Sequence, residues 1–237
     1  LDTLYANGIY VLMTVYYGYS ETPQSAAQMV CGLKSHPAII GWLVGNEWNY
    51  NNLGLNEQIS FTEAVDRVAK ATEAIKQNDS TRPVSTIYGG IPDVNVYNAL
   101  SMVDVWGLNI YTGASFGDLF TTWGALSGKP MFFGEYGADA YNGLTDSVDE
   151  AMQASLLESQ TSEIYANAAV TGGICAGGTV FEWNDEWWKY SGGSWSEHDT
   201  NSSWDNGAYP DPGMHEEWWG LVDIERNTRQ AYDIYAG

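Results

Sequence analysis

Two glutamates at the ends of apolar runs of strand length are the residues of this sequence best placed to do chemistry. Glu47 follows the run 39–45 directly after Asn46, and Glu135 ends the run 131–134. A run without polar alternation is typical of a strand buried on both faces of a parallel sheet. Such folds keep their chemistry at the carboxyl ends of the strands. The pattern therefore predicts two carboxyl groups at one edge of a sheet, a pairing that suits acid/base and nucleophilic catalysis.

The elements that must position these glutamates alternate between strand and helix. Thr22-Pro23 predicts a helix to about Lys34, because proline suits the first helical turn. Residues 95–100 show little pattern. Strands are expected at 9–16, 39–45, 83–88, 103–110, 131–134 and 179–183, and the main helices at 22–34, 59–77, 115–126, 146–168 and 228–235. Repeated β-then-α units predict a parallel sheet, either open and doubly wound or closed as a (β/α)8 barrel.

Two observations favour the barrel over the open sheet. No glycine-rich phosphate motif follows the first strand, which weakens a nucleotide-binding sheet enzyme as an alternative. Carboxylates at the ends of separate strands are typical of the barrel. At 237 residues the chain is expected to form one domain, spanning residues 1–237.

The composition favours a neutral or cationic ligand. The chain carries 30 acidic against 9 basic residues, a formal charge of −21. Such a surface repels phosphate polymers and anionic membranes, so we expect neither nucleic acid nor a membrane as partner. Aromatic residues make up 14% of the chain, with 11 Trp and 16 Tyr. Flat rings stack on the apolar faces of sugars, so the excess indicates carbohydrate, although core packing would also use such rings.

Neither a metal nor a cofactor is predicted. Cys31 and Cys175 are too few for a disulfide framework and match no metal spacing, so we expect free, buried thiols. The acidic residues of the long loop 184–219 could ligate Ca²⁺, but they lack a recognisable spacing and we expect a solvated loop. No stretch approaches the ~20 apolar residues of a membrane helix. Acidity and scarce lysine favour a secreted, extracellular protein.

Several of these segments resemble retaining glycoside hydrolases of clan A, family two in particular. The stretch His36 to Glu47 resembles the fourth barrel strand of that clan, whose signature is the Asn-Glu pair. Segments 105–111, 133–139 and 181–183 are similar to its sixth, seventh and eighth strands. The resemblance implies a (β/α)8 TIM barrel, of which this chain supplies about strands three to eight.

The first two strands of the clan, with a substrate-binding arginine often placed there, have no counterpart in this sequence. A six-stranded parallel arc cannot close, and its edges would be prone to aggregation. We therefore expect that an upstream segment or another chain completes the barrel.

The resemblance assigns the catalytic pair. Glu47 is the expected acid/base and Glu135 the expected nucleophile, with their carboxyls about 5 to 5.5 Å apart across the anomeric carbon. We expect the Tyr111 hydroxyl to help keep Glu135 ionised. Glu47 is expected to have its pKa raised by the apolar Trp48 and by the neighbouring carboxylate.

A second group of residues is expected to bind the sugar. Asn46 should bind the 2-hydroxyl of the sugar being cleaved, and Trp183 should form the floor beneath its ring. Glu182 is expected to be structural, because strand alternation turns it away from Trp183. The expected substrate-binding residues are Asn46, Trp48, Tyr88, Tyr111 and Trp183, and the candidates for lining outer subsites are Trp48, Tyr50, Tyr136 and Tyr141. Trp42 precedes the strand end and is expected in the core.

Together these features predict a retaining glycoside hydrolase or transglycosylase that acts on an oligo- or polysaccharide by double displacement. A neutral, β-linked glycan of the β-glucan type is the expected substrate. The alternative is a non-catalytic carbohydrate-binding or structural protein with a degenerate glycosidase barrel. A mechanism-based fluoro-sugar separates the two hypotheses, since only the enzyme would become labelled at Glu135.

Overall fold

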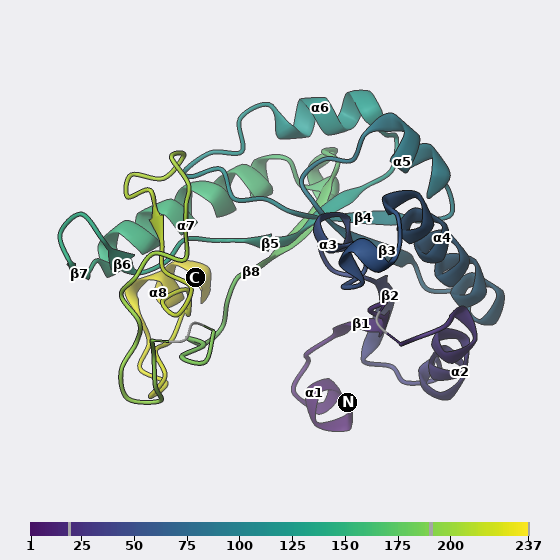
Figure 1. The fold of residues 1–237 in the computed structure, drawn as a ribbon, viewed down its shortest axis with the longest axis horizontal. Coiled ribbons are helices and arrows are strands. Elements are labelled where there is room, and N and C mark those ends of the chain that lie inside the picture. The colour runs from purple at the N-terminus through teal and green to yellow at the C-terminus, as the bar shows by residue number, and fades with distance from the viewer. Residues whose placement is uncertain (19, 190–191, 237) are drawn as a thin grey trace. The chain divides into compact units, whose positions relative to one another are not determined.

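The computed structural model describes residues 1–18, 20–189 and 192–236 (Figure 1). Its six longer strands follow the sheet order β1-β2-β3-β4-β5-β8, so strands that succeed one another along the chain are neighbours. The prediction of six parallel strands is confirmed. The chain divides into two compact units, Leu1–Asn109 with Ala125–Phe132 and Ile110–Gly124 with Phe133–Gly237.

Four parallel strands belong wholly to the first unit. They are β1 (Val11–Tyr16), β2 (Ile39–Val44), β3 (Val84–Gly89) and β4 (Val105–Asn109). Trp42 lies opposite Val84, and Ser85 lies opposite Val105. All six residues of β3 are buried, as expected for a central parallel strand. Because the strands run in parallel, the residues that follow β2, β3 and β4 lie at one edge of the sheet.

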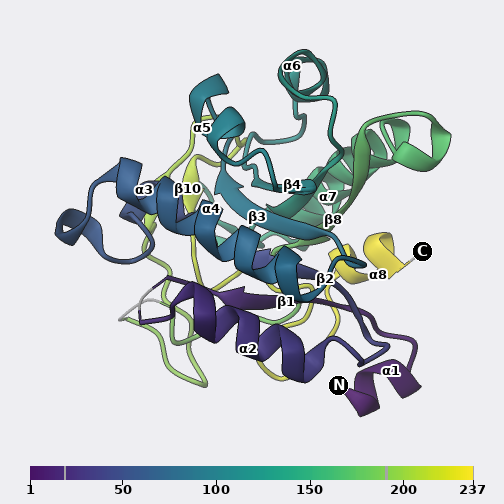
Figure 2. The same cartoon turned by 90° about the vertical axis from the view of Figure 1, so that its right-hand side faces the viewer.

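The helices of the first unit are α1 (Asp2–Ala6), α2 (Pro23–Leu33), α3 (Trp48–Asn51), η1 (Asn56–Gln58), α4 (Phe61–Asn78) and α5 (Val94–Ala99). Thr22 caps α2 in a capping box with Ser25, which confirms the predicted start. α2 packs against α4, and Figure 2 shows the two helices side by side. The poorly patterned segment 95–100 is helical, because the Asp93 carboxylate accepts from the backbone of Asn95 and Val96.

Trp42 is fully buried, as predicted. Its indole Nε1 donates to Asp79 Oδ2 at 3.0 Å. Burial acts to raise the pKa of Asp79, but hydrogen bonds from Thr81, Trp42 and Arg82 outweigh it and hold the pKa below its ordinary value. This buried carboxylate therefore fixes the turn 79–82, which leads into β3.

The second unit contains the last strands and the longest loop. Its elements are most of α6 (Leu119–Leu126) and β5 (Met131–Tyr136), then β6 (Tyr141–Asn142), β7 (Ser147–Val148), α7 (Glu150–Ala166), η2 (Ala169–Thr171), β8 (Cys175–Val180), β9 (Trp204–Asp205), β10 (Gly213–Met214) and α8 (Gln230–Ala236). α7 packs against α8 and β8. It begins later than predicted, with Asp149 as its cap, because the β6–β7 hairpin occupies 141–148.

The predicted eighth strand is placed too late in the sequence. β8 spans Cys175–Val180 rather than 179–183, so Glu182 and Trp183 lie beyond it. The strand-alternation argument for Glu182 therefore does not apply. The strand was not recognised from the sequence, because Gly177 and Gly178 interrupt its apolar pattern. Gly178 is required there, since a Cβ would lie 3.0 Å or less from Tyr136 and Phe133.

The loop after β8 is not solvated as predicted, because several of its carboxylates are buried. Asp185, Asp199, Asp211 and Glu217 are each 7% exposed or less. Each accepts backbone hydrogen bonds that hold the loop. Glu217, for example, accepts from the Asp199 amide at 2.7 Å. The acidic residues thus replace regular secondary structure as the scaffold of this loop.

Arg229 binds Asp185 through two hydrogen bonds of 2.6 Å, and both residues are nearly inaccessible to water.

Cys175 is buried as predicted, but Cys31 is exposed, and its thiol donates to Asn78 Oδ1 at 3.1 Å. Within the described ranges, no helix combines the length and apolar character needed to cross a bilayer.

Candidate functional site

Glu47 is presented by a sharp turn at the carboxyl end of β2. Gly45 has φ of 71° and Glu47 has φ of 45°, both in the left-handed region. A side chain at Gly45 would meet the Trp48 ring at 2.6 Å, so glycine is needed there. The Glu47 amide donates to the Ile87 carbonyl of β3 at 3.1 Å. A glutamate held in this uncommon conformation is typical of a functional position.

Trp48 anchors this turn and does not contact solvent. It is 0% exposed, and its Nε1 donates to Thr86 Oγ1 at 2.9 Å. Its ring stacks on Phe61 at 6.0 Å and meets Tyr88 edge-on at 5.4 Å. The prediction that Trp48 contacts substrate is therefore wrong. The apolar residue after the glutamate begins α3 and packs into the core.

Tyr88 also lies in the core, contrary to the prediction that it binds sugar. It is 8% exposed, and its ring packs between Trp48 and Trp106. Its pKa is raised, first by burial and then by the nearby Asp93 and Tyr50. Tyr88 is thus a support behind the edge of the sheet rather than a face on which a sugar can stack.

Asn46 is oriented by a neighbour that the sequence analysis did not single out. Asn109, the last residue of β4, donates through Nδ2 to Asn46 Oδ1 at 3.3 Å. Asn109 is 4% exposed and Asn46 is half-buried. This contact occupies the carbonyl oxygen of Asn46 and leaves its amide nitrogen as the group available to donate to a ligand. The only sequence signal for Asn109 was its position at a strand end.

In the second unit, Tyr111 and Glu135 meet as predicted. The Tyr111 hydroxyl donates to Glu135 Oε2 at 2.8 Å, and both side chains are half-buried. Trp219 packs edge-on against the Tyr111 ring at 5.2 Å. The Tyr111 carbonyl accepts from Asn206 Nδ2 at 2.9 Å. The carboxylate at the end of β5 therefore has a donor that is fixed by packing and by the long loop.

The remaining predicted aromatic residues differ in exposure. Trp183 is 57% exposed and packs edge-on against Tyr232 at 5.8 Å, so its ring is accessible to a ligand. Tyr136 and Tyr141 are 2% and 5% exposed, so neither lines an outer subsite. Tyr136 lies beneath α7, where burial raises the pKa of its hydroxyl to about 12. Tyr50 is 70% exposed.

Glu182 lies in a cluster of charged groups just past β8. Its pKa is raised to about 9, first by burial and then by the neighbouring Glu186, so the carboxyl is protonated at neutral pH. Its Oε1 is buried without a hydrogen-bond partner. Lys189 lies 3.4 Å from Glu186 Oε2 and 3.5 Å from Glu216 Oε2, and its ammonium also lies over the Phe181 ring.

The structure thus forms two groups of predicted residues, one in each unit. Asn46 and Glu47 lie together with Asn109 at the carboxyl edge of the first unit, and Tyr111 and Glu135 pair in the second. Among the described residues, no three His, Cys, Asp or Glu side chains are arranged to hold a metal ion. In the first group Asn46 and Glu47 follow β2, and the amide of Asn109 comes from the end of β4, the next strand but one. In the second group Glu135 belongs to β5, and the hydroxyl of Tyr111 follows the adjacent strand β4.

The chain is similar in sequence to one protein family. Residues 19–200 match the model described as glycosyl hydrolases family 2, TIM barrel domain. This match confirms the predicted family-two resemblance and the assignment of the six strands to part of a (β/α)8 barrel.

Solved structures share the fold at low sequence identity. A GH2 β-galacturonidase from Eisenbergiella tayi bound to galacturonate is 21% identical, with a TM-score of 0.57 over 90% of this chain and 35% of its own. A β-glucuronidase from Ruminococcus gnavus is 18% identical, with a TM-score of 0.60 over 90% of this chain and 34% of its own. A β-D-glucuronidase from Dictyoglomus thermophilum is 18% identical, with a TM-score of 0.57 over 93% of this chain and 36% of its own. The chain therefore spans about a third of the length of these proteins.

Proposed function

This chain belongs to the family 2 glycosyl hydrolases, and on that premise we propose that it carries the catalytic residues of a retaining glycosidase or transglycosylase. Glu135 is the nucleophile and Glu47 is the acid/base. The observation that carries the proposal is the 2.8 Å hydrogen bond from Tyr111 to Glu135. A donor directed at a carboxylate favours its ionised form, which is the form that attacks the anomeric carbon.

The proposal requires Glu47 and Glu135 to face one sugar, with carboxyls about 5 to 5.5 Å apart. Asn46 then donates to the 2-hydroxyl of the sugar through its free amide nitrogen. Trp183, whose ring is exposed, provides the floor beneath the sugar. The first step forms a bond from Glu135 to the anomeric carbon while Glu47 protonates the departing oxygen. In the second step Glu47 deprotonates water or a sugar hydroxyl, which displaces Glu135.

We propose a neutral, β-linked glycan as the substrate, because the chain offers little for an anionic one. Its nine basic residues are Lys34, Arg67, Lys70, Lys76, Arg82, Lys129, Lys189, Arg226 and Arg229. The first six lie on helices or in the turns that lead into strands, Arg226 is exposed in the loop before α8, and Arg229 is buried against Asp185. Lys189 alone closely follows the carboxyl end of a strand, and it is already held between Glu186 and Glu216. A uronate carboxylate would have to compete with both.

The sheet order leaves β1 and β8 at its two ends, although a (β/α)8 barrel has eight strands. We propose that a segment outside residues 1–237, or a second chain, supplies the other two. A hollow of about 460 Å³ lies beside β8, and its lining includes Ile164, Tyr165 and Val170. Tyr165 and Val170 are 75% and 93% exposed, an apolar surface that such a segment would cover.

The test is a set of 2-fluoro glycosides of β-linked neutral sugars, incubated with the complete natural protein. We expect a covalent adduct that peptide mapping places on Glu135. The control variant Glu135→Gln keeps the shape of the side chain and should give no adduct. Sugar binding without adduct or turnover across a broad panel of glycans would instead support a non-catalytic carbohydrate-binding protein.

The choice of substrate is tested separately, with paired β-glucosides and β-glucuronides. We expect turnover of neutral sugars to exceed turnover of uronides, and the reverse order would refute the proposal about charge.

We further propose that the protein is secreted, because its formal charge is −21 with 9 basic residues. Its presence in the culture medium of the source organism would test that proposal.

A further inference from the structure

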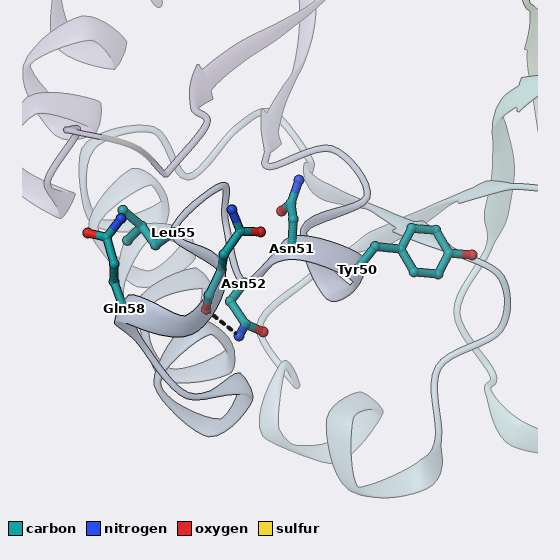
Figure 3. A pocket seen from close by; sticks show the side chains of 6 residues that line it. Tyr50, Asn51, Asn52, Leu55 and Gln58 are labelled. Atoms are coloured by element: carbon teal, nitrogen blue, oxygen red, sulfur yellow. Dashed lines mark hydrogen bonds between the residues drawn. The ribbon is translucent and has the colours of Figure 1, made fainter. Parts of the chain in front are cut away.

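A hollow of about 750 Å³ lies directly after the turn that carries Glu47 (Figure 3). It is lined by Tyr50, Asn51, Asn52, Leu55, Asn56 and Gln58. Among the lining residues whose side chains the structure describes, none carries a formal charge, and four of them end in an amide. Pockets of this composition suit a ligand with many hydroxyl groups and no charge.

Tyr50 provides an aromatic face beside this hollow. Its side chain is 70% exposed, and Figure 3 shows it extending away from the segment that carries Leu55 and Gln58. The ring lies against Gly89, the last residue of β3, where a Cβ would come within 2.2 Å of the Tyr50 ring. The absence of a side chain at position 89 therefore makes the seat for the ring.

The segment that carries Tyr50 is fixed to the sheet. Asn49 Nδ2 donates to the Gly89 carbonyl at 3.1 Å, and the Gly89 amide donates back to Asn49 Oδ1 at 2.8 Å. This two-way bond holds the start of α3 against the end of β3. An exposed ring on a fixed support loses little conformational entropy when a ligand stacks on it.

The lining amides divide into structural and available groups. Asn52 Nδ2 is used within the loop, where it donates to the carbonyls of Asn56 and Ile59. Asn51 Oδ1 accepts from the Gly54 amide. In the part of the chain that the structure describes, the side chains of Asn56 and Gln58 form no hydrogen bond and are exposed. Their amides can both donate to and accept from sugar hydroxyls.

The hollow lies close to Glu47 along the chain and in space. The Tyr50 amide donates to the Glu47 carbonyl at 3.0 Å, so one helical turn separates the two side chains. Burial and the Glu47 carboxylate both raise the pKa of the Tyr50 hydroxyl. An acid that protonates the departing oxygen of a glycoside must lie next to the leaving group.

We propose that Tyr50 and the amide-lined hollow form a binding site for the leaving-group side of the substrate, and that they take two uncharged sugar units. Tyr50 stacks on the first unit, and Asn56 and Gln58 bind hydroxyls of the second. This inference rests on the proposed function, because it takes Glu47 as the acid/base. It implies that the substrate is an oligosaccharide with a sugar as leaving group, rather than a glycoside of a small alcohol.

The test compares Tyr50→Ala with wild type on two kinds of substrate in the complete natural protein. One is a panel of neutral β-linked gluco-, galacto-, manno- and xylo-tetrasaccharides, and the other is the matching set of glycosyl fluorides. Fluoride does not occupy the leaving-group site. We expect kcat/KM on the best tetrasaccharide to fall by about tenfold or more, equivalent to ~1.4 kcal/mol of transition-state binding. Turnover of the fluoride should change by less than about twofold.

Two further variants distinguish the loss of stacking on the Tyr50 ring from a general effect on folding. Gly89→Ala keeps Tyr50 but displaces its ring, so it should reproduce the selective loss. Tyr5→Ala removes another exposed tyrosine, on α1 ahead of the amino end of β1, and should change the turnover of neither substrate. If kcat/KM of Tyr50→Ala is unchanged on both substrates, or falls equally on both, the inference is overturned.

The proposed function can fail separately. If wild type turns over no fluoride and labels no glutamate, the hydrolase is rejected, and tetrasaccharide binding by calorimetry then decides the inference. An affinity that Tyr50→Ala lowers by about tenfold retains a sugar site at Tyr50. If Tyr50→Ala binds with unchanged affinity, or if wild type does not bind, the proposed sugar site at Tyr50 is rejected.

Discussion

The hydrogen bond from Tyr111 to Glu135 makes the sharpest prediction. Tyr111→Phe removes the hydroxyl that lies 2.8 Å from Glu135 Oε2 and leaves the ring in its contact with Trp219. A hydrogen bond to a charged group contributes ~1.5–3 kcal/mol. Both side chains are half-buried, so water partly replaces the lost donor and the lower end of that range applies. We therefore expect kcat/KM to fall by about tenfold.

The pH profile gives the second measurement on the same variant. A donor to the ionised carboxylate lowers its pKa, so its removal raises the pKa of Glu135. The acid limb of kcat/KM should therefore move to higher pH. The assay is steady-state hydrolysis of an activated β-glycoside between about pH 3 and 8.

Tyr209→Phe is the matched control for this experiment. Its hydroxyl donates to the Gly137 carbonyl at 2.8 Å, and the residue is 6% exposed. Loss of that hydroxyl should lower the thermal midpoint without moving the acid limb. A Tyr111→Phe enzyme within twofold of wild type, with an unmoved acid limb, would refute the assignment of Tyr111 as the group that keeps Glu135 ionised.

Three further predictions concern stability. The pKa of Glu182 is raised to about 9, so the carboxyl is protonated in the folded state and ionised in the unfolded state over the interval between its ordinary pKa and about 9. The free energy of unfolding should therefore fall as pH rises through that interval, and Glu182→Gln should flatten this slope in denaturant titrations; an unchanged slope would contradict the burial argument. Trp48→Ala should lose ~3–5 kcal/mol in the same titrations, because the side chain is 0% exposed, and a loss below about 1 kcal/mol would show that the turn is not anchored by this ring. Arg229→Met should lose ~3–5 kcal/mol by leaving Asp185 as an unpaired buried charge, and most of that loss should return in the double variant with Asp185→Asn; without recovery, the pair is not the cause.

Features set by local sequence could be predicted well. Thr22 and Pro23 specify a helix start through capping and a fixed backbone angle, and the structure begins α2 at that point. The apolar runs before Glu47 and Glu135 specify parallel strands, and four of the six residues of β2 are buried, while Ile40 is 50% exposed. The Tyr111 contact also followed from the sequence, since adjacent parallel strands bring their ends to one edge.

Features set by neighbours from distant parts of the chain could not be predicted. The eighth strand was predicted three to four residues too late, because Gly178 makes room for Tyr136 and Phe133, a contact that no local pattern records. The acidic loop was expected in water, yet Asp185 is buried because Arg229 and backbone amides supply its hydrogen bonds. Charge alone says nothing about which partners the fold will bring.

The sequence by itself determined that carboxylates stand at the ends of parallel strands, because apolar runs and a repeated β-then-α order can be read from residues near in the chain. Only the tertiary structure decided which aromatic rings are accessible. Trp48 and Tyr50 are separated by one residue, yet the first is enclosed by Phe61, Tyr88 and Thr86 and the second lies open over Gly89. Burial is a property of the surroundings rather than of the residue, and those surroundings come from β3 and α4.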